Sequence, residues 1–183
     1  PRPRPGLRGG RMKTAAAKKI THAELLRIAV YDPATGVFRW KVSVSRKARA
    51  GKVIGTRVQA TRGGIYLRGK INHQLYFLHR LAWFYMHGEW PADEVDHING
   101  DSTDNRLCNL RSVSREVNQE NIRRAKRNSK TGLLGVMHTR GGKYRSAIRV
   151  RGVFHHLGHF DTAEQAHAAY VEAKRRLHEG CTL

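Results

Sequence analysis

A histidine beside a carboxylate, followed at fixed distances by amide side chains, is the part of this sequence best suited to hydrolytic chemistry. The segment VDHINGD (Val95 to Asp101) contains Asp96 and His97, and Asn109 and Asn118 follow further along the chain. Carboxylate and amide oxygens are ligands for a hard divalent cation. An imidazole, whose ordinary pKa is about 6.5, can act as a general base at neutral pH. The pattern therefore predicts a hydrolytic site built around one metal ion.

Two strands and a helix are expected to position these side chains. The predicted elements, in order, are a strand at Val95 to Ile98, a turn at Asn99 to Asp101, a strand at Leu110 to Val113, and a helix from the N-cap Ser114 to about Arg127. On this helix Asn118 and Asn121 stand on the face that Ile122 is expected to turn inward. Burying an amide without a partner costs about 1–3 kcal/mol. A metal ion or its water shell is one candidate partner.

These side chains have different expected roles at the predicted metal site. Asp96 and Asn118 are predicted to hold Mg²⁺, with Mn²⁺ as a possible substitute, while waters and a phosphate oxygen complete the octahedron. His97 alternates to the opposite side of the strand from Asp96, but at a strand end or bulge it can still be aimed at an attacking water. Asn109 is expected to fix the tautomer of His97, either directly or by bracing the loop. Arg115 either steadies charge on the phosphate or is a solvated arginine at the helix start.

The charge of the chain indicates a polyanionic partner. There are 35 Lys and Arg residues against 14 Asp and Glu, a formal net charge of +21, which is more than surface solvation requires. A protein on an anionic membrane surface would also be cationic. However, no segment approaches ~18 uninterrupted apolar residues, and the basic residues interleave with strand residues. Double-stranded DNA is therefore the expected partner, with no membrane involved.

The cysteines and the N-terminal residues favour a cytoplasmic setting. Cys108 and Cys181 are too few for a disulfide framework or a four-cysteine zinc site. No signal peptide is visible from Pro1 to Arg11, and Met12 is a candidate start because the chain opens on proline. Residues 1–19 are expected to form a disordered basic tail.

Residues 20–128 are expected to form one domain around the candidate site. Thr21 and Glu24 form a capping-box pair, which predicts a short helix that ends near Tyr31. A small antiparallel sheet is then predicted from β-type runs at Val37 to Trp40, Val53 to Val58, Ile65 to Leu67 and Leu75 to Phe77. A helix is predicted over Phe77 to His87. On it, His79 either reaches a phosphate or is a hydrogen-bonded structural histidine.

The Asp96-His97 pair, Asn109 and Asn118 resemble the HNH homing-endonuclease family, in the branch whose third motif position is Asn instead of His. The resemblance covers roughly residues 20–125 and includes the motifs YDPATGVFRW (31–40), HRLAW (79–83) and HGEWP (87–91). It implies a ββα-metal core at about residues 93–127 and Mg²⁺-assisted phosphodiester hydrolysis. It also implies His97 as the base, Asp96 and Asn118 as ligands, Asn109 as the residue that orients His97, and products with 5′-phosphate and 3′-hydroxyl ends. A phage or mobile-element origin, with action at the DNA of the host cell, fits this family.

A second pattern lies in residues 129–183. Strands are predicted at Gly135 to His138, Lys143 to Val150 and Val153 to Gly158. The middle strand and the residue after it are expected to place four cations on one face: Lys143, Arg145, Arg149 and Arg151. Four cations side by side repel one another, so the row predicts contact with DNA phosphates or guanine edges. Thr162 and Gln165 form a capping box for a helix whose alanines permit close packing on the sheet.

This second segment resembles an APETALA2-type DNA-binding domain, most clearly in LGHFDTAEQA (157–166) and in the Ala-Ala-Tyr helix. The resemblance implies a three-stranded sheet that enters the major groove. Met137 and Thr139 stand where the family has cations, so only Lys143 and Arg149 carry over as DNA contacts. His155 and His156 are expected on opposite faces, which favours surface or DNA-contacting histidines over a metal site.

Together the patterns and resemblances predict an α+β protein, with a ββα-metal (HNH) nuclease domain followed by a small three-stranded antiparallel sheet packed on one helix. The expected activity is metal-dependent DNA hydrolysis of the HNH homing type, as a nick or a double-strand break. The expected state is a monomer or a DNA-dependent dimer. One alternative is a non-enzymatic DNA-binding regulator with a degenerate HNH domain. Another is an RNA-processing nuclease.

Overall fold

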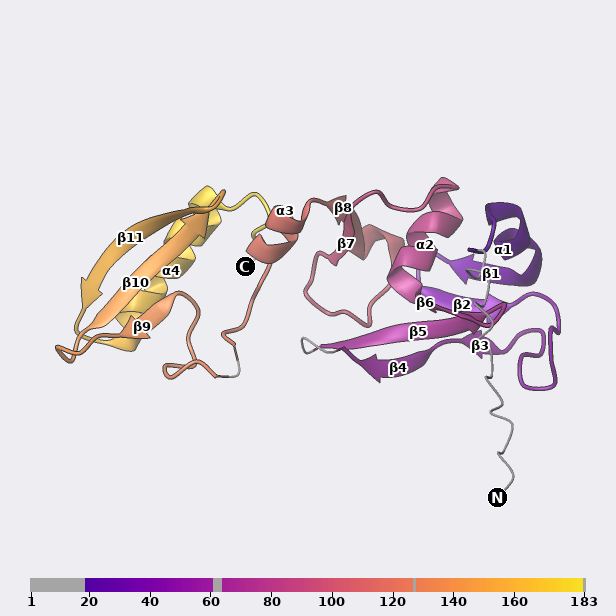
Figure 1. The fold of residues 1–183 in the computed structure, drawn as a ribbon, viewed down its shortest axis with the longest axis horizontal. Coiled ribbons are helices and arrows are strands. Elements are labelled where there is room, and N and C mark those ends of the chain that lie inside the picture. The colour runs from indigo at the N-terminus through magenta and orange to yellow at the C-terminus, as the bar shows by residue number, and fades with distance from the viewer. Residues whose placement is uncertain (1–18, 61–63, 127, 183) are drawn as a thin grey trace, which may run out of the picture.

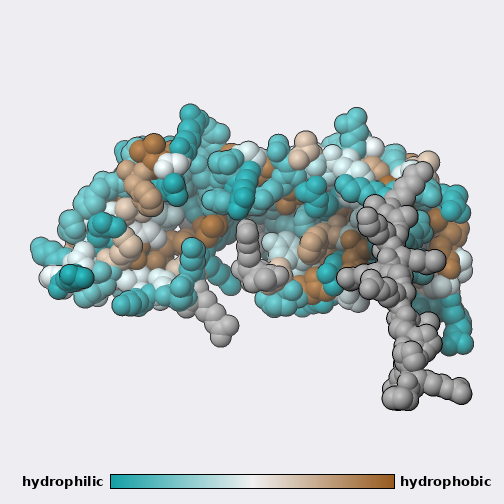
Figure 2. All heavy atoms as spheres, viewed as in Figure 1, coloured by the Kyte–Doolittle hydropathy of each residue, from teal (hydrophilic) through white to brown (hydrophobic). Residues whose placement is uncertain are grey.

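The computed structural model describes residues 19–60, 64–126 and 128–182, and it has the α+β architecture that the sequence predicts (Figure 1). The predicted basic tail lies outside the described residues except for Lys19. Within the described part of the chain, no helix has both the length and the apolar character needed to cross a bilayer. The face seen in Figure 2 is mostly hydrophilic, and its hydrophobic residues gather in small patches.

The first helix begins and ends close to the predicted residues, and a sheet follows it. α1 (His22–Ile28) begins with the expected capping box, in which the Thr21 hydroxyl accepts from the Glu24 N–H and the Glu24 carboxylate accepts from the Thr21 N–H. The helix ends before Tyr31 because the chain turns extended at Ala29. The first sheet has the order β1-β2-β3, with β1 at Ala29–Asp32, β2 at Val37–Trp40 and β3 at Val53–Ile54.

A second antiparallel sheet corrects the prediction of a single sheet in this region. The run at Val53 to Val58 is divided at Gly55, whose φ of 124° lets the chain leave the first sheet and enter the second. The second sheet has the order β4-β5-β6, with β4 at Thr56–Gln59, β5 at Ile65–Ile71 and β6 at Gln74–Phe77. α2 (Leu78–His87) follows and ends at the left-handed Gly88, as predicted.

The central ββα unit consists of β7 (Glu94–His97), β8 (Leu110–Val113) and α3 (Arg115–Glu120), with a 3-10 turn at Leu107–Asn109. Ser114 caps α3 as predicted. The predicted helix end at Arg127 is wrong, because α3 ends at Glu120 and the side chain of its C-cap, Asn121, turns back to β7. Ile122 is also not inward-facing, since 49% of it is exposed.

The hydrophobic core lies under α1, α2 and the first sheet and extends to the ββα unit. Its fully buried members include Leu25, Phe38 and Leu81. Val95 on β7 and Leu110 on β8 belong to the same buried cluster. Burial of these apolar side chains fixes the register of the β7-β8 hairpin. The positions of the polar residues beside them are therefore set by the core.

The C-terminal unit is a sheet of order β11-β10-β9 with α4 packed on one face (Figure 1). Its elements are β9 at Val136–His138, β10 at Tyr144–Val150, β11 at Val153–Phe160 and α4 at Ala163–Leu177. The predicted capping box of Thr162 and Gln165 is confirmed. Gly135 allows a close approach to α4, because a Cβ there would lie 1.8 Å from the Tyr170 ring.

Candidate active site

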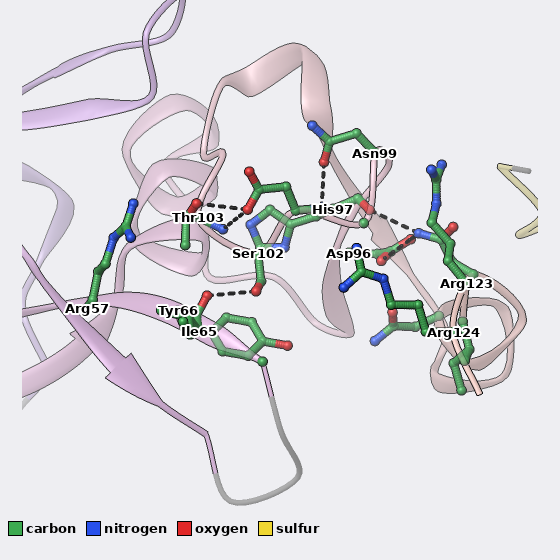
Figure 3. A pocket seen from close by; sticks show the side chains of 16 residues that line it. Arg57, Ile65, Tyr66, Asp96, His97, Asn99, Ser102, Thr103, Arg123 and Arg124 are labelled. Carbon is green, nitrogen blue, oxygen red and sulfur yellow. Dashed lines mark hydrogen bonds between the residues drawn. The ribbon is translucent and has the colours of Figure 1, made fainter. Parts of the chain in front are cut away.

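Asp96, His97 and Asn118 line one cavity of about 970 Å³, whose wall also contains Asn121 (Figure 3). Strand β7 supplies the first two of these residues and helix α3 supplies the third. Asp96 lies opposite Arg111 in the β7-β8 pairing, and both Asp96 and His97 are buried. The structure therefore brings together the predicted base and both predicted metal ligands.

The ring of His97 packs among aromatic side chains. Its centroid lies 5.1 Å from that of His79 and 6.2 Å from that of Tyr66. Burial, together with the neighbouring charges of His97 and Arg80, lowers the pKa of His79 to about 3. His79 is therefore a neutral packing partner of His97. Its Nδ1 atom is buried without a hydrogen-bond partner among the described residues.

Asn105, and not Asn109, contacts the ring of the predicted base. Nε2 of His97 lies 3.0 Å from Oδ1 of Asn105, and Asn105 is 1% exposed. Asn109 instead accepts from the Asn99 N–H and donates to the Asp104 carbonyl, so it braces the loop between β7 and β8. Of the two roles expected for Asn109, its contacts match bracing of the loop and not direct contact with His97. Asn105 belongs to the same DNRLCNLR motif, but its spacing alone did not identify it.

The carboxylate of Asp96 is held on one side by two neighbours. Its Oδ2 atom accepts from Nε and Nη2 of Arg111 at 3.0 and 2.9 Å and from Nδ2 of Asn121 at 2.9 Å. Its Oδ1 atom has the longer contact, 3.2 Å from the same amide nitrogen. Oδ2 therefore has its lone pairs occupied, and Oδ1 is the atom better placed to bind a cation. Sequence reasoning did not identify the contacts of Arg111 and Asn121 with Asp96.

The remaining donor set suits a cation that keeps much of its water. The amide nitrogen of Asn118 donates to the Glu94 carboxylate, so the carbonyl oxygen is the atom of this side chain that is left to bind a cation. Within the residues described, no three His, Cys, Asp or Glu side chains form a metal-binding group. A cation here would be held by one carboxylate and one amide oxygen, with water completing its shell. Mg²⁺ has this preference for few protein oxygens and several waters.

Cationic side chains border the same cavity. Arg57 lines it from β4, and Arg124 lines it from the segment after α3 (Figure 3). A cavity of this kind with positive charge on its rim attracts the phosphates of a nucleic acid. Ser102 closes a further part of the wall by donating to the Ile65 carbonyl at 2.7 Å. This contact ties the β7-β8 loop to the second sheet.

On the C-terminal sheet, the predicted row of four cations is shorter than expected. Arg145 and Arg149 stand on β10 and alternate with Ser146 and Ile148, which are buried under α4. Lys143 precedes β10 and forms an ion pair with Asp161 at 3.2 Å. Within β10 itself, Arg145 and Arg149 occupy the face opposite α4 by strand alternation.

Arg151 lies apart from that face. It occupies the turn after β10 with a φ of 46°, and its guanidinium contacts Glu179 at 2.6 Å. The positive φ breaks the strand alternation on which the prediction depended. Arg151 therefore points toward the residues that follow α4.

An exposed aromatic residue lies beside Arg149 on the open face of the sheet. Phe154 pairs with Arg149 across the strands, and the guanidinium lies 5.1 Å from the ring centroid. Phe154 is 72% exposed, the highest value among the large hydrophobic side chains described. The histidines follow the predicted alternation, since His156 pairs with Ala147 and His155 with the buried Ile148. Sequence reasoning overlooked Phe154.

The sequence comparisons agree with the geometry of the ββα unit. Residues 76–120 match a family model described as HNH endonuclease. The matched stretch includes α2, β7, β8 and α3, and with them Asp96, His97, Asn109 and Asn118. Neither the comparison with curated proteins nor the comparison with solved structures returned a match. The stretch that carries the candidate site is thus similar to HNH endonucleases.

Proposed function

We propose that the protein is a metal-dependent DNA endonuclease of the HNH homing type. The observation that carries the proposal is the convergence of Asp96, His97 and Asn118 on one cavity. These residues lie within the stretch that matches HNH endonucleases. The net charge of +21 supports a nucleic acid as the substrate.

His97 is proposed to accept a proton from the attacking water. An amide oxygen can only accept a hydrogen bond, so the contact with Oδ1 of Asn105 places the proton of the neutral ring on Nε2. Nδ1 is then the basic nitrogen. A well-placed general base contributes about 10²–10⁴-fold to a rate. The neutral His79 beside His97 adds no positive charge that would oppose protonation of the base.

Asp96 and Asn118 are the proposed ligands of Mg²⁺, through Oδ1 of the carboxylate and the carbonyl oxygen of the amide. A cation bound there would stabilise the negative charge that develops on the phosphate. Arg111 and Asn121 hold the other carboxylate oxygen in place. Arg57 and Arg124 are proposed to attract the phosphate backbone to the cavity.

The C-terminal sheet is proposed to bind the target duplex. Arg145 and Arg149 would contact phosphates or base edges from the open face, with Lys143 and Arg151 at the two ends of the strand. The sheet would supply affinity and register, while the ββα unit cuts the strand. The described residues contain one such unit, which favours a nick for each binding event unless two chains act together.

A plasmid assay tests this proposal. Supercoiled DNA incubated with the protein and Mg²⁺ is expected to become nicked, with 5′-phosphate ends. His97→Ala is expected to lose most of the cleavage and to keep its DNA affinity. A wild-type protein that binds the plasmid but does not cut it with Mg²⁺ or Mn²⁺ supports the non-enzymatic regulator instead. Structured RNA offered in the same assay tests the substrate, and faster cutting of RNA contradicts the DNA assignment.

A further inference from the structure

The residues after α4 return to the ββα unit and contact the partners of Asp96. The Gly180 carbonyl accepts from Nη2 of Arg111 at 3.0 Å, and the same guanidinium donates to Asp96. The Gly180 N–H donates to the Glu120 carboxylate at 3.2 Å. Arg111 thus connects the backbone of the C-terminal segment to the candidate metal ligand.

Thr182 provides a second connection through a different residue. Its hydroxyl donates to Oδ1 of Asn121 and accepts from Nε of Arg123 at 3.0 Å. The amide nitrogen of Asn121 donates in turn to the Asp96 carboxylate and, at 2.9 Å, to the His97 carbonyl. One buried amide therefore contacts the C-terminal segment with its oxygen and the candidate site with its nitrogen.

The C-terminal residues pack closely against α3 and the segment that follows it. A Cβ at Gly180 would lie 2.2 Å from the Val117 carbonyl oxygen in α3. Lys174 of α4, only 1% exposed, donates to the Ile122 carbonyl. These contacts hold the end of α4 against the segment that follows α3. They connect a sheet proposed for DNA binding to a site proposed for cleavage.

We infer that Gly180 and Thr182 are positioning residues for Asp96, acting through Arg111 and Asn121. This inference rests on the proposed function, because it assigns the segment to the same metal site. A ligand carboxylate binds a cation well only when its orientation is fixed, and its supporting partners typically change metal affinity by about 10–100-fold. Here part of that support comes from beyond α4, so the C-terminal unit and the metal site are coupled.

The test compares Thr182→Val with Thr182→Ser in the full chain. Valine keeps the shape of the side chain and removes the hydroxyl, whereas serine keeps the hydroxyl. Mn²⁺ affinity is measured by calorimetry, and amide hydrogen exchange is measured over β7 and α3 in metal-free protein. Thr182→Val is expected to bind Mn²⁺ about 10-fold more weakly and to exchange faster at these amides. Thr182→Ser is expected to resemble the wild type, and DNA affinity should not change in either variant.

A glycine pair supplies an independent comparison. Gly180→Ala introduces the close contact with Val117, whereas Gly141→Ala adds a methyl group with no atom within 4 Å. Only Gly180→Ala is expected to reproduce the effect of Thr182→Val. Unchanged exchange in both Gly180→Ala and Thr182→Val overturns the inference. If exchange rises but wild-type protein itself binds no Mn²⁺, the coupling is supported and the metal-dependent function fails.

Discussion

The imidazole of His97 and the side-chain amide of Asn105 are joined across the β7-β8 loop by a 3.0 Å hydrogen bond. The backbone of Asn105 is held in turn from the first sheet, since its carbonyl accepts from the Tyr31 hydroxyl at 2.7 Å. Gly36 packs against the same backbone, and a Cβ there would lie 2.5 Å from the Asn105 carbonyl carbon. The N-terminal sheet therefore fixes the residue that orients the proposed base.

Replacing Asn105 tests this orientation. Asn105→Ala removes the acceptor and is expected to slow DNA cleavage by about 10–100-fold without weakening DNA binding. Asn105→Asp keeps an acceptor but adds a negative charge, which stabilises the protonated form of the neighbouring imidazole. The acidic limb of its pH–rate profile should therefore move to higher pH. Wild-type rates in Asn105→Ala at every pH would remove Asn105 from the mechanism.

Metal removal tests the role of Asp96 separately from that of His97. EDTA is expected to abolish cleavage, and added Mg²⁺ should restore it. Asp96→Asn removes the charge of the ligand, so we expect it to need a much higher Mg²⁺ concentration for half-maximal cleavage. His97→Ala should leave that concentration unchanged while its maximal rate falls. Cleavage that resists EDTA contradicts Asp96 and Asn118 as ligands.

Burial of His79 predicts a pH dependence of stability. Its pKa falls from 6.5 to about 3 in the folded protein, so between these values the unfolded chain binds a proton that the folded chain does not. The free energy of unfolding should therefore fall as the pH drops below 6.5, and this loss should stop near pH 3. His79→Phe removes the titrating group and fits the aromatic surroundings of Tyr66 and Phe77.

Urea unfolding at pH 7 and pH 5 measures this effect. Each unit of pKa difference corresponds to about 1.4 kcal/mol, so wild type should lose roughly 2 kcal/mol more than His79→Phe between the two conditions. Equal losses in the two proteins would mean that the His79 ring takes up its proton in the folded state. The comparison cancels the contributions of the histidines that do not contact His79.

Local sequence patterns predicted where most helices and strands lie, but they predicted less well where α3 ends and which side chains touch. The capping boxes at Thr21 and Thr162 mark helix starts because a side chain bonds the backbone within one turn. The end of α3 was missed because Asn121 is drawn to Asp96, a contact across 25 residues that helix spacing does not encode. The same limit applies at the site. Spacing indicated Asp96, His97 and Asn118, but the position of Asn105 on the ring depends on how the loop folds.

Arg149 and Arg151, near the end of the central strand of the C-terminal sheet, differ in their surroundings and should differ in their contribution to DNA binding. Arg149 stands beside Phe154 on the open face, whereas Arg151 lies in the turn and pairs with Glu179. We expect Arg149→Ala to weaken duplex binding by about 10-fold or more and to reduce the slope of log affinity against log salt by about one. Arg151→Ala removes the same charge and should have a smaller effect on both quantities. Fluorescence anisotropy at several salt concentrations measures them, and equal losses in the two variants would mean that net charge, and not the open face, governs binding.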